Sequence, residues 1–175
     1  MAVSLIFRTP DEIVFRSDEV NLESPELQMS LVVDVCDQLD EAGCTFDVTG
    51  CGLEWRTDVS WDLSTILHKV PNVVAALERG EDTEVYFFEQ GLSRKFLLGP
   101  GNDGVTAVRV ISDDVESPDI PGAVAETIRT EELVAMLTQL CVGTATAILT
   151  VNPRLAEIEP LPRWRAGDLS VLSTD

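Results

Sequence analysis

Two clusters of carboxylates are the residues of this sequence whose types and spacing could do chemistry. Paired acids can perform acid–base catalysis or hold Mg²⁺ when burial tunes their pKa values or when their oxygens surround the ion. One cluster has the i, i+3, i+7 spacing of a helix face, and the other lies in a proline-containing segment. The clusters are Asp34, Asp37, Asp40 and Glu41, and Asp113, Asp114 and Glu116.

Neither cluster has the surroundings that those reactions need. An EF-hand loop requires oxygen ligands at alternate positions around a central glycine, and both runs lack this pattern and an apolar pocket. Between Asp11 and Glu41, ten acidic residues stand against one basic residue, Arg16. An ordinary exposed helix interleaves lysine with its acids, so this imbalance favours a surface that contacts a positively charged partner. We expect both clusters to form that surface, and we predict no metal site.

Other catalytic motifs are weak or missing. His68 is the only histidine, it stands in an apolar helical pattern, and no GxSxG elbow accompanies it. The glycine-rich run 99–104 lacks the Lys-Ser/Thr of a phosphate-binding loop and stands between strand patterns, so it predicts a turn. The pair Arg94-Lys95 stands across a turn from Glu89, which predicts a cross-strand ion pair. We therefore predict a protein that is not an enzyme, with no catalytic residue and no cofactor.

Composition and charge describe one strongly acidic domain. The chain has 175 residues, a net charge of −19, a hydrophobic fraction of 45%, three Trp and six Phe, which is enough apolar material for a single core. Such a charge exceeds what solubility needs and destabilises the fold by self-repulsion. Lys and Arg clusters that could neutralise phosphates are absent, so we expect no direct binding to nucleic acid.

The N-terminal segment and the cysteines point to the cytoplasm. Residues 1–15 have no basic region and only a short apolar run, unlike a secretory signal or a membrane span, so we expect a cytoplasmic protein with no membrane contact. The four cysteines show no CxxC spacing, and a chain of this size needs no disulfide. We predict buried free thiols at Cys36, Cys44, Cys51 and Cys141.

The pattern of β-branched and aromatic residues over 83–112 predicts three strands in an antiparallel meander, because its connections are too short for a crossover helix. Within its third strand, Thr106 and Arg109 stand among apolar residues, which suggests one wet face and one covered by helices. Alternation over 44–49 and 53–57 predicts a second hairpin. A third, shorter hairpin would join residues 3–8 to 13–15.

Three helical patterns surround these strands. The first starts at Ser24-Pro25 and is closed by Gly43, and the second runs from Trp61 to Leu77 with Pro71 splitting it into two pieces. The third is capped by Thr130 and stopped at Pro153, with an apolar stripe along one side. From about residue 153, a tail containing Trp164 would lie extended over the surface. The whole predicts an α+β fold, an antiparallel sheet packed against two or three amphipathic helices in a single domain, 1–175.

One set of residues, mostly glycines and apolar or aromatic residues, lies within positions 44–112: Phe46-x-Val48-x-Gly50-x-Gly52, Trp55, Asp62-Leu63, Leu67-x-x-Val70-Pro71, Leu77-x-x-Gly80, Tyr86-Phe-Phe-Glu-Gln-Gly91 and Arg94. In these residues the segment resembles a family of small bacterial proteins in which immunity proteins of polymorphic-toxin systems are common. These are structural residues, and they cover under half of the chain. The resemblance implies a cytoplasmic α+β protein that binds and blocks a cognate toxin domain, and it implies no interface residue.

The leading hypothesis is therefore an immunity protein that occludes a basic toxin domain, such as a nuclease or another nucleotide-handling toxin. Clustered carboxylates would complement the cationic cleft of such an enzyme. Several alternatives stay open: a DNA-mimic inhibitor with phosphate-like carboxylate spacing, an adaptor or chaperone for a secreted effector, an enzyme with a buried carboxylate pair, or adaptation to a salty habitat. The oligomeric state is also open.

Overall fold

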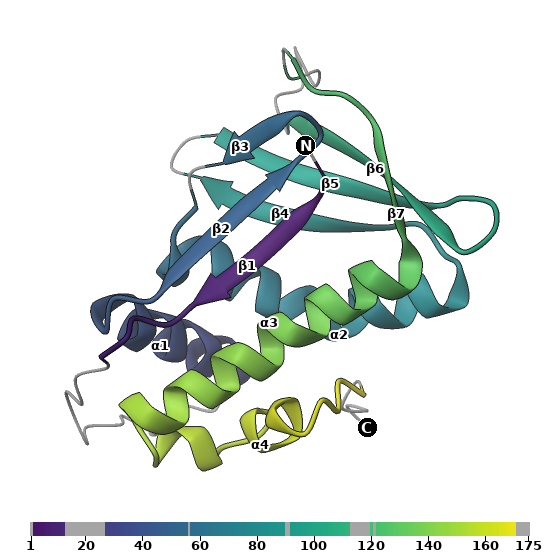
Figure 1. Ribbon diagram of the computed structural model, residues 1–175. Coiled ribbons are helices and arrows are strands. Elements are labelled where there is room, and N and C mark those ends of the chain that lie inside the picture. The colour runs from purple at the N-terminus through teal and green to yellow at the C-terminus, as the bar shows by residue number, and fades with distance from the viewer. Residues whose placement is uncertain are drawn as a thin grey trace.

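The computed structural model describes residues 2–12, 27–55, 57–89, 92–112, 120 and 122–170. Two antiparallel sheets lie above a layer of helices, with the smaller sheet in front of the larger one in the view of Figure 1. Buried apolar side chains from both sheets and from the helices form one hydrophobic cluster. The predicted α+β class, antiparallel sheet packed against amphipathic helices, is confirmed.

The smaller sheet has the order β1-β2-β3, with strands β1 (Ser4–Arg8), β2 (Thr45–Gly50) and β3 (Leu53–Trp55). The predicted hairpin between the second and third of these strands is confirmed. β1 does not need residues 13–15 as a partner, because it pairs with β2 along its whole length. This pairing sets buried Leu5 opposite buried Val48, which a local hairpin could not do. Residues 13–15 lie outside the described part of the chain.

The larger sheet contains the predicted meander and one strand that the sequence did not suggest. Its order is β4-β5-β6-β7, with β4 (Thr83–Glu89), β5 (Leu92–Pro100), β6 (Val105–Ser112) and β7 (Glu126–Arg129). Thr106 lies on the buried face of β6 and Arg109 on its exposed face. Lys95 pairs with Glu84, at 3.2 Å, whereas the side chain of the predicted partner Glu89 lies outside the described part of the structure. The register explains the pair with Glu84, because Lys95 stands opposite Tyr86 and Glu84 follows on the same face.

Within the residues that the structure describes, four α-helices and two shorter helical turns accompany the sheets. They are α1 (Leu27–Glu41), the single π-helical turn η1 (Val59–Leu63), α2 (Ser64–Arg79), α3 (Thr130–Val151), the 3₁₀ turn η2 (Leu155–Glu157) and α4 (Leu161–Arg165). The predicted start of α1 lies outside the described residues, whereas Gly43, at φ 83°, follows its end as predicted. The predicted break at Pro71 is wrong, since α2 continues through it. Buried Val70, Val73 and Val74 hold both halves against the core, and this packing outweighs the lost backbone donor.

Helix α3 is the longest element and runs beneath both sheets (Figure 1). The predicted apolar stripe is confirmed, with Leu133, Leu137, Leu140 and Cys141 buried. Thr130 does not cap the helix as predicted: its Oγ1 lies 2.9 Å from the Oγ1 of buried Thr106 and so ties α3 to the larger sheet. The helix is long and apolar enough to cross a membrane, but in this fold nine of its side chains are buried and it packs on β1, α1, α2 and α4. This is the environment of a core helix.

An aromatic cluster joins the two sheets. The ring of Trp55, from β3, lies 4.6 Å from that of Phe87 and 4.8 Å from that of Phe96, and the two Phe rings are 5.1 Å apart. Edge-to-face contacts of this kind add to the stabilisation from burial. The aromatic cluster is therefore a part of the core through which the two sheets pack against each other.

The four cysteines are buried and free, as predicted.

Gly50 stands where the smaller sheet packs against Phe96 of the larger sheet, and its replacement by alanine is expected to destabilise the protein. A Cβ there would lie 3.2 Å from the Val3 Cα and 3.4 Å from the Phe96 Cζ, on a backbone with φ of +152°. Crowding and strain together predict a loss of about 1–3 kcal/mol in the free energy of unfolding. Urea denaturation would measure it. Gly104→Ala is the control, because its φ is +73° with nothing within 4 Å, and an equal loss in both variants would contradict the crowding argument.

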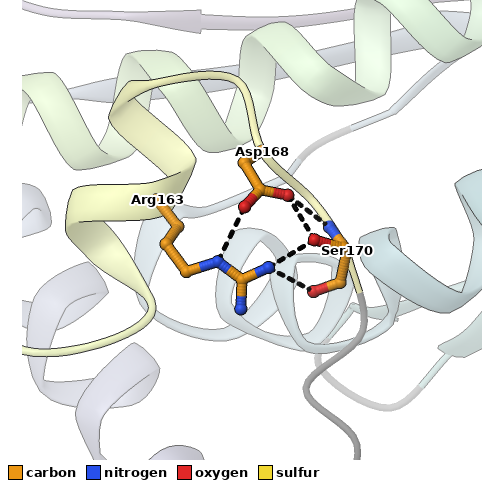
Figure 2. A network of polar contacts seen from close by, with 3 residues as sticks. All are labelled: Arg163, Asp168 and Ser170. Atoms are coloured by element: carbon orange, nitrogen blue, oxygen red, sulfur yellow. Dashed lines mark hydrogen bonds and ion pairs between the residues drawn. The ribbon is translucent and has the colours of Figure 1, made fainter.

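The C-terminal segment does not run extended from residue 153, as the sequence suggested. It forms η2 and α4, and it buries Leu161 and Trp164. Figure 2 shows how its end is held: Arg163 Nε donates to Asp168 Oδ2 at 2.8 Å, and the Ser170 N–H donates to Asp168 Oδ1 at 2.9 Å. The bond from Arg163, followed by those from Ser170, lowers the pKa of Asp168. The C-terminal segment is therefore folded onto the protein by apolar contacts and by this polar network, and it is not extended as predicted.

Candidate functional site

Helix α1 presents its carboxylates on the side opposite to the core. Asp34, Asp37, Asp40 and Glu41 are all exposed, so the structure brings together the first predicted group of partner-binding residues. The side that packs on the protein carries Leu31, Val32, Val35, Cys36 and Leu39, none more than 3% exposed. The helical period alone separates these two sets, because apolar residues at spacings of three and four fill one side. α1 is therefore pinned by its apolar side and offers four acids to solvent.

The exposed carboxylates of α1 act on one another electrostatically. Partial burial, and then the negative charge of Asp37, raise the pKa of Asp34. Partial burial also raises the pKa of Asp40, with further contributions from Asp58, Asp37 and Glu41. The raised pKa means that each ionised carboxylate is disfavoured, first by partial burial and then by repulsion from the neighbouring acids. A cation bound at this surface would relieve that repulsion.

Asp58 joins this group from a different element. It precedes η1, which packs against α1, and its charge contributes to the raised pKa of Asp40. The sequence reasoning missed it, because it is 17 positions beyond Glu41 and read only as a helix start. We call Asp34, Asp37, Asp40, Glu41 and Asp58 together the acidic surface.

No cation neutralises the acidic surface within the described part of the chain. Lysines and arginines pair with acids elsewhere: Arg8 with Asp47, Arg79 with Glu81, Lys95 with Glu84, Arg129 with Glu131, Arg163 with Asp168, and Arg165 with Glu157. Other exposed acids, such as Glu78 and Glu132, occur on α2 and α3, so negative charge is not confined to α1. The acidic surface differs in density, since four of its carboxylates lie within eight residues of one helix.

Trp61 stands beside the acidic surface, next to Asp58. The second helical pattern was predicted to begin at this residue, and in the structure its side chain is 63% exposed. It belongs to η1, where Asp58 Oδ1 accepts a hydrogen bond from the Trp61 N–H at 2.6 Å. The other two tryptophans, Trp55 and Trp164, are only 7% and 4% exposed. The period of α2 does not extend back into η1, and the wider π-helical turn rotates Trp61 outward.

The second predicted group cannot be placed. Asp113, Asp114 and Glu116 fall in 113–119, outside the described residues. The structure therefore brings four of the seven predicted partner-binding residues together and adds Asp58 and Trp61 to them.

The described residues were compared with the two arrangements most typical of catalysis, a hollow with charged side chains and a cluster of metal ligands. A hollow of about 680 Å³ lies where the end of α2 meets the β5–β6 turn and the start of α3. Of its charged side chains, Arg79 is already paired with Glu81 at 2.6 Å, and both are exposed. Searching the described residues finds no group of three His, Cys, Asp or Glu side chains that could hold a metal ion.

Asp62 is a buried carboxylate with a structural task. It is 1% exposed, and its Oδ2 accepts a hydrogen bond from the Asp58 N–H at 3.0 Å. Because Asp58 in turn accepts from the Asp62 N–H, the two residues cap η1 reciprocally. The role of Asp62 in positioning Asp58 and Trp61 follows from these bonds.

Comparison of the chain with protein-family models, with curated proteins and with solved structures finds no match in any of the three.

Proposed function

We propose that the protein binds a basic protein partner through the acidic surface, and that it acts as a cytoplasmic immunity protein that occludes a cognate toxin domain. The observation that carries the proposal is the group of five neighbouring carboxylates that forms the acidic surface. Among the described residues, no lysine or arginine forms an ion pair with any of them. A nuclease or another nucleotide-handling toxin fits this surface, because an enzyme that holds phosphates needs a cationic cleft.

The physical advantage of such a surface lies mainly in the rate of association. Complementary charge steers encounter and raises the association rate constant above the values of about 10⁵–10⁶ M⁻¹s⁻¹ typical of uncharged pairs. A net charge of −19 extends this attraction beyond the contact itself. Salt screens it over about 8–10 Å, so the rate should fall as ionic strength rises. An immunity protein benefits from fast capture because a free toxin acts before it is bound.

Charge reversal at Asp37 and Asp40 tests the proposal. The partner is first isolated by co-purification from the native host and identified, and its binding kinetics are then measured at several salt concentrations. Asp37→Lys/Asp40→Lys should lower the association rate constant by at least about tenfold at low salt and flatten its salt dependence. Titration of the partner's own activity should show stoichiometric inhibition by the wild type.

A control variant separates the surface from the net charge. Glu78→Lys/Glu132→Lys changes the charge equally, and Glu78 lies about 21 Å along α2 from Ser64, the end next to η1. Its association rate should stay within about threefold of wild type. Equal losses in the two double variants would reject the acidic surface. Binding that requires an unfolded segment of the partner would point to a chaperone.

A further inference from the structure

Trp61 is the exposed aromatic side chain of a turn whose backbone is held on both sides. The Trp61 N–H donates to Asp58 Oδ1 at 2.6 Å, and the Trp61 carbonyl accepts from Ser64 Oγ at 3.0 Å. Its neighbours Val59 and Leu63 are 1% and 0% exposed, so η1 is anchored in the core. The backbone that carries the indole is therefore held in place while the side chain is exposed, although a tryptophan is usually well buried.

We infer that Trp61 is the anchor residue of the acidic surface and that its indole face receives an arginine side chain of the basic partner. This inference rests on the proposed function, since it supposes that a basic protein docks here. A guanidinium stacks on an indole through cation–π attraction and pairs with carboxylates at the same time, which a lysine ammonium does less well. Asp58 supplies a carboxylate directly beside the Trp61 backbone, and Asp40 lies close enough for Asp58 to affect its pKa.

The rigid backbone explains why one residue can matter this much. Tryptophan is enriched among the few interface residues that dominate binding, where it fills a pocket and excludes water. A backbone that is already ordered loses little conformational freedom on binding, so more of the contact free energy of Trp61 appears as affinity. Carboxylates around it act chiefly on the association rate, whereas a buried aromatic contact acts on the dissociation rate. The two parts of the surface therefore have separable kinetic effects.

A titration with short peptides tests the anchor without the natural partner. The probes are tetra-arginine and tetra-lysine, and the readouts are tryptophan fluorescence and calorimetry. Trp55 and Trp164 are buried, so Trp61 dominates the response to quenchers in solution. Tetra-arginine should bind the wild type about tenfold more tightly than it binds Trp61→Ala, and Trp61→Phe should retain part of the affinity. Cs⁺ should quench Trp61 more strongly than I⁻, because the surrounding charge is negative.

The variants distinguish failure of the anchor from failure of the surface. Since Trp61 is exposed, Trp61→Ala should keep the urea midpoint of the wild type, which excludes unfolding as the cause. Equal tetra-arginine affinity for wild type and Trp61→Ala, with weaker affinity for Asp37→Lys/Asp40→Lys, would overturn the anchor and leave the acidic surface standing. Equal affinity for all three proteins would overturn both. Preference for tetra-lysine over tetra-arginine would overturn the assignment of arginine.

Discussion

Phe96→Ala should lower the free energy of unfolding by about 4 kcal/mol, one of the two largest effects expected in this protein. Phe96 is 1% exposed and contacts the rings of Trp55 and Phe87, so its truncation removes burial and leaves a void between the sheets. A Cβ placed on Gly50 would lie 3.4 Å from the Phe96 Cζ, so the smaller sheet already packs closely against this ring. Urea denaturation monitored by circular dichroism would measure the loss.

Two further variants show whether the aromatic contacts themselves contribute. Phe96→Leu keeps most of the volume and should cost clearly less than Phe96→Ala. A double-mutant cycle with Phe87→Leu should give a coupling energy of about 0.5–1.5 kcal/mol. A cost for Phe96→Ala below about 1 kcal/mol would mean that this side chain is not packed between the sheets as described.

The second large effect is a steep loss of stability above about pH 9. Burial raises the pKa of all four thiols from an ordinary value of 9.0, and for Cys44 and Cys51 it reaches about 11. Nearby acids add to the shift, notably Asp37 and Asp40 at Cys36. A raised folded-state pKa contributes stability that is fully present below the unfolded-state pKa and is lost as pH rises through the folded value. Four thiols that ionise only on unfolding give a slope of roughly 5 kcal/mol per pH unit between about pH 9.5 and 10.5.

Urea unfolding under reducing conditions at a series of pH values would measure this slope. Few other groups titrate in that range, since the chain has one tyrosine and two lysines. Cys36→Ala/Cys141→Ala should halve the slope, because two of the four thiols are removed. Thiolate absorbance near 240 nm should stay low in the folded protein at about pH 10 and rise on unfolding. A stability that is flat across this range would show that the thiols are accessible in the native state.

Local patterns in the sequence were enough for elements whose partners are neighbours in the chain. The meander over 83–112, the hairpin ending at Trp55 and the stripe of α3 follow from alternation and helical period, which record burial directly. Long-range partners were beyond such patterns. The pairing of β1 with β2 spans about forty residues, and it sets the buried side chains of both strands on the shared core.

Among the charged residues too, those on one helix could be predicted from the sequence, and those brought together by tertiary packing could not. The acidic side of α1 could be predicted because one helix carries its four carboxylates, Asp34, Asp37, Asp40 and Glu41. Asp58 could not, since its place beside Asp40 depends on how η1 packs against α1. The pair of Lys95 with Glu84 could not be predicted either, because the strand register that brings the two residues to one face is a property of the sheet and not of the turn.

By itself, the sequence determined the α+β class, the acidic character and the free thiols, because composition and periodicity act locally and survive any arrangement of the elements. Only the tertiary structure decided which tryptophans are covered. Trp164, expected on a surface tail, is buried under α3, while Trp61, at the start of the second helical pattern, is exposed beside the acidic surface. The physical reason is that exposure depends on what packs against a side chain, and those neighbours come from distant parts of the chain.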